Sequence, residues 1–358
     1  MTGFSFLRTR PHAIPIAIFA PLLLLVLSVN ATALAAPSGK PLQIYFADVE
    51  GGQATLFVTP AGQSLLIDAG WPGNNGRDAD RIVALARQAK LTKIDYVLIT
   101  HFHTDHVGGV PQLAARIPIG AFLDHGPNRE STDKDTTAGW EAYQKVLAEK
   151  HIQHMTMKPG DSLPIQGVES TVISADGDLI AGPLPGAGAE NPYCKQSETR
   201  PPDQTENARS LGTLLTYGKL RILDLGDLTW DKEMQLMCPV NKLGHIDILV
   251  VSHHGWYQSS SPALVDAIGA RVAVMDNGAK KGGSPAAWTT IHSAPGLEDL
   301  WQLHYSDEGG PAHNVAAGFI ANPQGPDAGH SIKLMAYPDG SFDVSNSRTG
   351  TTKHYAAH

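Results

Sequence analysis

The sequence has little cysteine, little charge and no cluster of basic residues. Two of its 358 residues are Cys and 16 are His, which points to imidazole and carboxylate chemistry and away from thiolate chemistry. Charged residues make up 17%, with a formal charge of −8 and no run of Lys and Arg. Long nucleic acid is therefore not the expected partner, because binding it depends on clustered basic side chains. The 42% of hydrophobic residues is enough for a buried core and excludes wholesale disorder.

The N-terminal segment, residues 1–35, has the pattern of an export signal. Early basic residues precede the apolar run AIFAPLLLLVLSV, and the sequence ALA at 33–35 has the small residues of a cleavage site. A membrane anchor is the alternative. The run is shorter than the roughly 20 residues that a spanning helix needs, and Pro15 and Pro21 interrupt it. We expect cleavage, no membrane segment afterwards, and a periplasmic or secreted protein.

The cysteines, Cys194 and Cys238, stand 44 positions apart. In an oxidising compartment they could form a disulfide that ties a long loop to the core. Two unpaired thiols remain the alternative, because the sequence does not show whether the two side chains are close together.

Strand-like and helix-like segments alternate after the signal. Residues 42–67 predict a meander of short strands, because they are rich in β-branched and aromatic residues and are broken by Gly-rich turns. Apolar spacing predicts helices over 77–91, about 107–117 and 140–151. The second half repeats this alternation and ends in a predicted hairpin with a Pro-Asp-Gly turn at 338–340. Two sheets packed face to face with helices outside fit this order, as one domain over 36–358.

The strongest functional signal is the sequence His101-Phe-His103-Thr-Asp105-His106. In an extended segment side chains two apart point the same way, so the first three of these polar residues can converge while the chain turns at the last. The glycines at 108–109 allow the backbone to pass close to a bound group. Four potential ligands within six residues indicate a metal site.

This loop and four further motifs resemble those of the metallo-β-lactamase superfamily. The segments FADVEGGQATLF, SLLIDAG, RILDLGD and LVVSHHG occur in that family's order, over roughly residues 43–285. The resemblance implies an α/β fold, a four-layer αββα sandwich with the metal loop at the mouth of its two sheets. It is closest to the branch that contains the hydrolase domain of DNA-uptake competence proteins and the phosphorylcholine esterases, which share the opening D-V-x-x-G and the His-His-Gly sequence.

The resemblance also implies two divalent metal ions, with zinc favoured and manganese or iron as alternatives. The implied ligands are imidazoles and carboxylates: His101 and His103 for one ion, and Asp105, His106 and His254 for the other, with Asp227 bridging. The spacing does not decide between His253 and His254. His254 is the preferred ligand, and the other imidazole would then face the substrate or support the site.

Two polar residues, Asn207 and Ser210, stand where lactam- and thioester-hydrolysing members carry another His. This departure argues against a β-lactamase and leaves an open coordination position for an oxygen of the substrate. The predicted catalytic residues are those beside that opening: Asp105, His253, His254, Asn207 and Ser210. Asp68, after the strand SLLI, is expected to orient an imidazole of the loop, or to accept hydrogen bonds from backbone amides in a buried turn.

These observations predict an exported binuclear metal-dependent hydrolase that cleaves a phosphodiester or a related small phosphoester through a metal-bridging hydroxide. Lactone or β-lactam hydrolysis by the same fold is the first alternative, and a metal-dependent binding module is the second. The acidic surface favours a small-molecule substrate over a polymer. Lys280 and Lys281 form a small basic spot that could contact a phosphate, although a solvated loop is the preferred interpretation.

Overall fold

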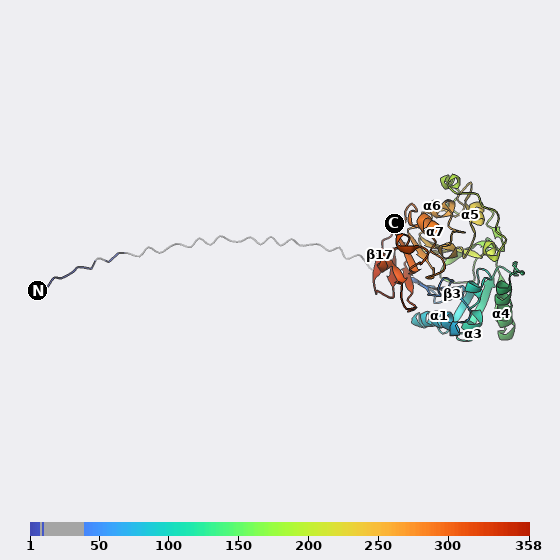
Figure 1. Ribbon diagram of the computed structural model, residues 1–358, viewed down its shortest axis with the longest axis horizontal. Coiled ribbons are helices and arrows are strands. Elements are labelled where there is room, and N and C mark those ends of the chain that lie inside the picture. The colour runs from blue at the N-terminus through green and yellow to red at the C-terminus, as the bar shows by residue number, and fades with distance from the viewer. Residues whose placement is uncertain (8, 11–38) are drawn as a thin grey trace. The chain divides into compact units, whose positions relative to one another are not determined.

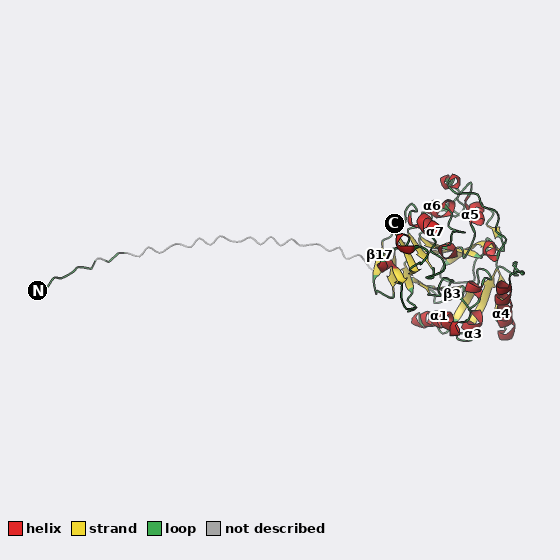
Figure 2. Cartoon of the chain, in the orientation of Figure 1, coloured by secondary structure: helices red, strands yellow, loops and turns green. Residues whose placement is uncertain are grey.

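Two large β-sheets face each other in the computed structural model, which describes residues 1–7, 9–10 and 39–358 (Figure 1 and Figure 2). The first sheet contains β1 (Leu42–Phe46), β2 (Thr55–Val58), β3 (Ser64–Ile67), β4 (Ile94–Leu98), β5 (Ile119–Asp124), β6 (Gln153–Thr156), β15 (Ile332–Ala336), β16 (Phe342–Asn346) and β17 (Thr352–Tyr355). The second contains β7 (Glu169–Ala175), β8 (Asp178–Leu179), β9 (Gly212–Tyr217), β10 (Leu220–Asp224), β11 (Ile248–Val250), β12 (Val272–Met275), β13 (Asp299–His304) and β14 (Ile320–Asn322).

The strand order brings the first strand and the last three strands into one sheet. The first sheet runs β17-β16-β15-β1-β2-β3-β4-β5-β6, and the second runs β14-β13-β12-β11-β10-β9-β7-β8. Neighbouring strands from β3 to β6 are parallel, as are those from β10 to β14. The loops that follow the parallel strands of each sheet therefore leave that sheet at one edge, where ligand sites of α/β sheets are usually found.

Helices cover the outer face of each sheet. The helices on the first sheet are α1 (Arg77–Gln88), α2 (Thr104–Val107), α3 (Val110–Ala114) and α4 (Lys134–Lys150), and those on the second are α5 (Trp230–Met237), α6 (Pro262–Ile268) and α7 (Pro285–His292). Short 3-10 turns occur at Asn74–Gly76, Pro192–Lys195, Glu206–Arg209, Ser252–Gly255, Gly310–Ala312 and Ala317–Phe319. The predicted four-layer αββα architecture is confirmed.

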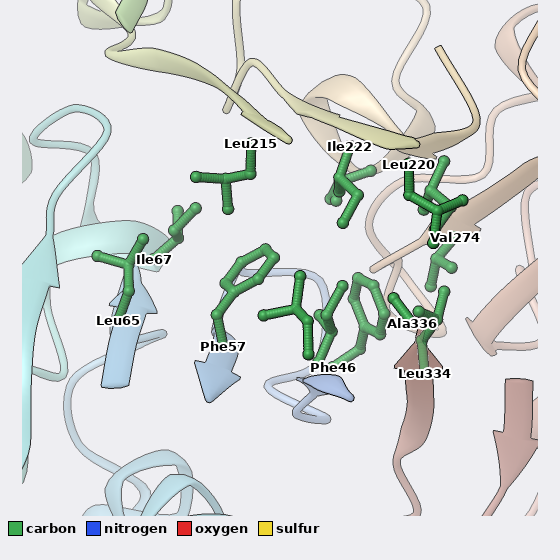
Figure 3. Packing of buried hydrophobic residues seen from close by; sticks show 14 of the residues in the cluster. Phe46, Phe57, Leu65, Ile67, Leu215, Leu220, Ile222, Val274, Leu334 and Ala336 are labelled. Carbon is green, nitrogen blue, oxygen red and sulfur yellow. The ribbon is translucent and has the colours of Figure 1, made fainter. Parts of the chain in front are cut away.

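The central core lies between the two sheets. Figure 3 shows Phe46 and Phe57 of the first sheet facing Leu215 and Ile222 of the second, and all four are buried. Ile44 of β1 also points into this core. The next residue, Tyr45, points to the opposite face of the sheet and packs under the helices of the first sheet. Because alternate side chains of a strand enter opposite layers, a strand between two covered faces is apolar at nearly every position.

One predicted helix is wrong in its extent. The segment 107–117 is not one helix: Val107 is the last residue of α2, and α3 covers only Val110–Ala114. The break lies at Gly108 and Gly109, where a Cβ atom would stand 2.3 Å from Pro72 Cδ and 2.0 Å from the Ala69 carbonyl oxygen. The glycines thus allow the chain after the metal loop to pass directly against the segment that follows β3.

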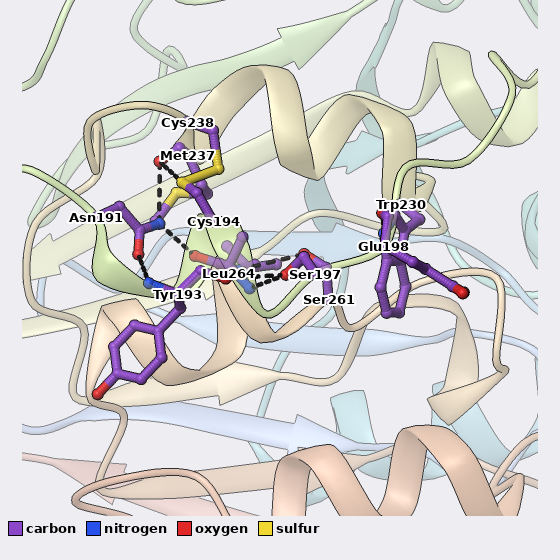
Figure 4. Close-up of a disulfide and its surroundings, with 11 residues drawn as sticks. Asn191, Tyr193, Cys194, Ser197, Glu198, Trp230, Met237, Cys238, Ser261 and Leu264 are labelled. Atoms are coloured by element: carbon purple, nitrogen blue, oxygen red, sulfur yellow. Dashed lines mark hydrogen bonds between the residues drawn. A yellow bond between two sulfur atoms is a disulfide. The ribbon is translucent and has the colours of Figure 1, made fainter.

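The two cysteines are joined in a disulfide, Cys194–Cys238 (Figure 4). The bond ties the loop before β9 to the end of α5. The same loop is also held by Asn191, whose side-chain amide donates to the carbonyl oxygens of Met237 (3.0 Å) and Ala263 (2.8 Å). The segment predicted to be a long surface loop is therefore fastened to the second sheet's helical layer.

Replacing both cysteines by Ser is expected to lower the free energy of unfolding by about 2–4 kcal/mol, because the unfolded chain loses a cross-link over the intervening segment. Urea unfolding monitored by circular dichroism measures this, and the metal content should not change. Reduction of the natural protein should give the same shift. An unchanged unfolding midpoint in both experiments would contradict the assigned role of the disulfide.

The predicted signal peptide, residues 1–35, lies largely outside the described residues and stays a prediction. From residue 39 onward the described chain forms one compact unit. Within the described ranges, every helix is too short or too polar to cross a membrane.

Candidate metal centre

The predicted ligands follow parallel strands of both sheets. His101 and the residues after it lie in the loop after β4, Asp227 lies shortly after β10, and His254 follows β11. The folding of distant segments into facing sheets therefore brings together one loop of the first half and two of the second. This is the arrangement that the sequence motifs predicted.

Four of these residues form a tight buried group: Asp105, His106, Asp227 and His254. Each offers one ligand atom, and the four atoms lie within 4.8 Å of one another. His254 Nε2 is 3.1 Å from Asp105 Oδ2 and 3.2 Å from His106 Nε2. His106 Nε2 is 3.3 Å from Asp227 Oδ2. The preferred ligand of the His-His pair, His254, is thus a member of the group.

The remaining two imidazoles lie beside this group, with the His101 and His106 rings 4.1 Å apart between centroids. His101 Nε2 and His103 Nδ1 are 3.1 Å apart, and His101 Nε2 is 3.9 Å from Asp227 Oδ2. Asp227 Oδ2 therefore faces one imidazole nitrogen of each set, at 3.9 Å from His101 and 3.3 Å from His106, which is compatible with the predicted bridging role. The Oδ1 atom of Asp227 is buried and has no hydrogen-bond partner among the described residues.

Each imidazole that points into this centre is held by its other ring nitrogen. The partners are His101 Nδ1 with Thr100 Oγ1 (3.0 Å), His103 Nε2 with Glu130 Oε2 (3.0 Å), His106 Nδ1 with Asp68 Oδ2 (2.7 Å) and His254 Nδ1 with Asp276 Oδ1 (3.3 Å). Such partners fix the orientation and tautomer of a metal-binding imidazole and increase its basicity. Asp68 has both of its predicted roles, since it also accepts from the Thr100 amide (2.8 Å).

The surrounding charges favour the ionised form of the two carboxylates among the candidate ligands, Asp105 and Asp227. Burial acts to raise the pKa of Asp227, but the imidazoles of His106, His253 and His254 hold that pKa well below its usual range. Burial likewise acts to raise the pKa of Asp105, and Lys281 and His106 keep it well below the usual range. Ionised carboxylates are the form that binds a cation.

The donor atoms fit a divalent metal ion. Imidazole nitrogens and carboxylate oxygens are the ligands of zinc, and they also accept manganese or iron. The unpartnered oxygen of Asp227 supports this fit, because a buried carboxylate oxygen otherwise finds a hydrogen-bond donor. A water or substrate oxygen beside such an ion is the reactive arrangement of metal-dependent hydrolases.

His253 lies next to the four-residue group without belonging to it. Its Nε2 atom is 3.4 Å from Asp227 Oδ2, and its Nδ1 atom is 3.4 Å from Ser259 Oγ. Its ring stacks on Trp256 at 6.2 Å between centroids. Burial lowers the pKa of His253 to about 4, so this imidazole is neutral at pH 7.

The two polar residues predicted to be catalytic, Asn207 and Ser210, are placed differently from each other. Ser210 is fully buried, lies 3.5 Å from His101 Nδ1 and accepts from the backbone amide of Asp227 at 3.2 Å. Its hydroxyl therefore supports two candidate ligands from behind instead of facing a substrate. Asn207 is also buried, and its Oδ1 atom has no hydrogen-bond partner within the described chain.

Sequence reasoning missed several residues that hold the centre together. Asp276 carried a usable signal, because it directly follows a buried strand, β12, as Asp68 follows β3. Glu130 lies in a loop without such a pattern. Glu206 is fully buried and accepts hydrogen bonds from the Phe102 amide (3.2 Å) and the Arg129 amide (2.6 Å). No local pattern marks a carboxylate that joins distant loops.

A cleft of about 500 Å³ opens beside the segments that continue from Asp227 and His254. Trp230, Arg200 and Tyr257 line it, and the Arg200 guanidinium lies 3.6 Å from the centre of the Trp230 ring. The side chain of Tyr257 is 51% exposed. None of the candidate ligands lines this cleft, which has aromatic side chains in its wall and can receive an organic group.

The sequence comparisons agree with this geometry. Residues 47–188 match the family model of the metallo-beta-lactamase superfamily. A hydroxyacylglutathione hydrolase of Stenotrophomonas maltophilia is 38% identical over 63 residues, which are 18% of this chain and 21% of the relative. A UPF0173 metal-dependent hydrolase of Herpetosiphon aurantiacus is 26% identical over 127 residues, 35% of this chain and 44% of the relative. The matched part is thus less than half the length of either relative.

Solved structures give a distant likeness. A metallo-beta-lactamase of Cronobacter sakazakii has a TM-score of 0.32 and 16% identity, covering 52% of this chain and 60% of that one. The zinc-bound PqqB of Methylobacterium extorquens has a TM-score of 0.35 and 13% identity, covering 58% and 71%. Scores this low support no inference about the chemistry of the site.

Proposed function

We propose that the chain belongs to the metallo-beta-lactamase superfamily, whose family model matches residues 47–188, and that it is a metal-dependent hydrolase with two metal ions, zinc being favoured. Its proposed substrate is a small phosphodiester or a related phosphoester. The chain is proposed to be exported, and its motifs support a place near the competence-protein and phosphorylcholine esterase branch.

One observation carries the proposal: Asp227 Oδ2 lies 3.9 Å from His101 Nε2 and 3.3 Å from His106 Nε2, and the far nitrogens of the surrounding imidazoles are all held. His101 and His103 would hold one ion, and the group around Asp105 and His254 would hold the other. Ions bound there supply an acidified water and an electrophilic contact for the substrate. The protein supplies fixed ligands and a buried, preorganised setting.

The other residues define what enters the centre. His253 is a neutral imidazole beside Asp227 and can exchange a hydrogen bond with the substrate. Asn207 and Ser210 stand where lactam-hydrolysing members carry a further His. Because the Ser210 hydroxyl supports two candidate ligands from behind, the position of that His would stay open at the first ion, and this supports a phosphoryl group over a lactam carbonyl. With a formal charge of −8 the protein repels polyanions, so a small diester is preferred to a polymer.

The test is a hydrolysis panel on zinc-loaded protein. Bis-para-nitrophenyl phosphate is expected to be hydrolysed with a kcat/KM at least about tenfold above those of nitrocefin and a γ-lactone, because two cations stabilise the charge of a phosphoryl transition state best. A preference for the lactam or lactone would replace the phosphodiesterase assignment by the first alternative. Metal binding with no turnover of any substrate would favour a binding module.

A further inference from the structure

Lys281 reaches the candidate metal centre from a separate loop. Its ammonium group is ion-paired with Asp105, and it lies 5.1 Å from the centre of the Trp71 ring. Within the described chain, Lys281 is the one basic Lys or Arg side chain in ion-pair contact with a candidate carboxylate ligand. The interpretation preferred in the sequence analysis, a solvated loop, is wrong for Lys281, because its side chain is only 23% exposed.

The backbone around Lys281 is clamped from two sides. A Cβ atom on Gly51 would lie 2.9 Å from Lys281 Cβ, so the loop after β1 is in contact with the base of this side chain. A Cβ atom on Gly282 would lie 2.2 Å from the His254 carbonyl oxygen, and the Gly283 amide donates to that oxygen at 2.9 Å. The loop therefore packs directly on a candidate ligand and directs Lys281 to the centre.

The ammonium group has hydrogen-bonding capacity that the protein does not use. A Lys ammonium carries three N–H donors. Asp105 is its one hydrogen-bond partner within the described residues. The unused donors and the partial exposure of the side chain leave the positive charge accessible at the centre.

We propose that Lys281 binds the anionic group of the substrate, the phosphodiester monoanion, beside the metal ions. This inference rests on the proposed phosphoester hydrolase function and deepens it. It makes Lys281 a specificity-determining residue, because a charged donor stabilises an anionic substrate and contributes little to a neutral one. A neutral lactone would not use it.

The neighbouring residue provides a matched control. Lys280 carries the same charge, is exposed, and makes no ion pair within the described residues. A loss of general surface charge would affect Lys280→Met and Lys281→Met equally. A specific contact affects only the second variant.

Binding of inorganic phosphate to the zinc-loaded protein is the first measurement, by isothermal titration calorimetry. Lys281→Met is expected to weaken it about 10- to 100-fold, the usual effect of losing a hydrogen bond to a charged group. Lys281→Gln should behave in the same way, which covers the case in which the Met variant folds poorly, and Lys280→Met should stay within about twofold of the natural protein. Metal content, measured by mass spectrometry, must be equal in all samples. Unchanged phosphate binding in both Lys281 variants would overturn the proposal.

Kinetics separate this proposal from the proposed function. For Lys281→Met, kcat/KM for bis-para-nitrophenyl phosphate should fall about 10- to 100-fold, while kcat/KM for the neutral triester diethyl para-nitrophenyl phosphate changes less than about threefold. Equal losses for the two substrates would overturn the role of Lys281 and leave the hydrolase standing. Phosphate binding that depends on Lys281, without turnover of any phosphoester, would support the role of Lys281 and overturn the proposed hydrolase function.

Discussion

Asp227→Asn is expected to abolish tight metal binding at both groups of ligands and to reduce hydrolysis by on the order of 10³-fold or more, since both proposed ions would depend on this one carboxylate. The structure places that carboxylate 3.9 Å from His101 Nε2 and 3.3 Å from His106 Nε2, one imidazole from each group. The Asn side chain keeps the volume and removes the negative charge. Substitution of any other predicted ligand should mainly weaken the binding of one ion.

The measurement is metal content per chain by mass spectrometry after dialysis, together with the hydrolysis rate. Asp80→Asn is the control, because Asp80 is an exposed carboxylate that pairs with Arg116 far along the surface from these ligands. Full metal content in Asp227→Asn would remove Asp227 from the bridging position. Loss of one ion with the other retained would show that Asp227 binds with only one group of ligands.

Glu206→Ala is expected to lower the free energy of unfolding by about 3–5 kcal/mol, because it leaves several buried donors without an acceptor. Glu206 is fully buried and accepts from the Phe102 amide, the Arg129 amide and His125 Nε2, the last at 2.9 Å. Phe102 stands between His101 and His103 in the sequence, so the variant should also weaken the binding of the metal ion that these two imidazoles would hold.

Urea unfolding gives the free energy, and zinc titration gives the affinity. Glu169→Ala, at an exposed position where β7 begins, should change neither by more than about 0.5 kcal/mol. Glu206→Gln should lie between Glu206→Ala and the natural protein, because the amide retains one acceptor oxygen. Equal unfolding midpoints for the Glu206 and Glu169 variants would show that the loops do not depend on this carboxylate.

Glycines explain one error of the sequence analysis. The periodic pattern over 107–117 is compatible with one helix, and a glycine pair within it lowers helix stability only modestly. At the break the Gly109 amide donates to the carbonyl oxygen of Gly70, which is distant in sequence, at 2.9 Å, and this contact interrupts the hydrogen-bond ladder of the helix. Helix propensity therefore gave the type of the element, and tertiary packing set its ends.

The His-His pair shows a second limit. His253 and His254 both have φ of 54°, the left-handed region that residues other than glycine seldom adopt. Alternation along a strand does not apply to such a backbone, so the spacing could not tell which imidazole points to the metal centre. Both point to Asp227, at 3.4 Å in each case.

The sequence by itself determined the fold class, through the periodicity of its strands and helices, and it marked the H-x-H-x-D-H loop as a metal site. The ligands outside that loop, Asp227 and His254, came from the resemblance of their motifs to those of a known family. Only the tertiary structure decided how those ligands are supported and what else reaches them. Glu130, Asp276, Glu206 and Lys281 each act on residues at least 22 positions away in the chain. Contacts of this kind depend on which loops the two sheets bring together, and no local pattern of residues records that arrangement.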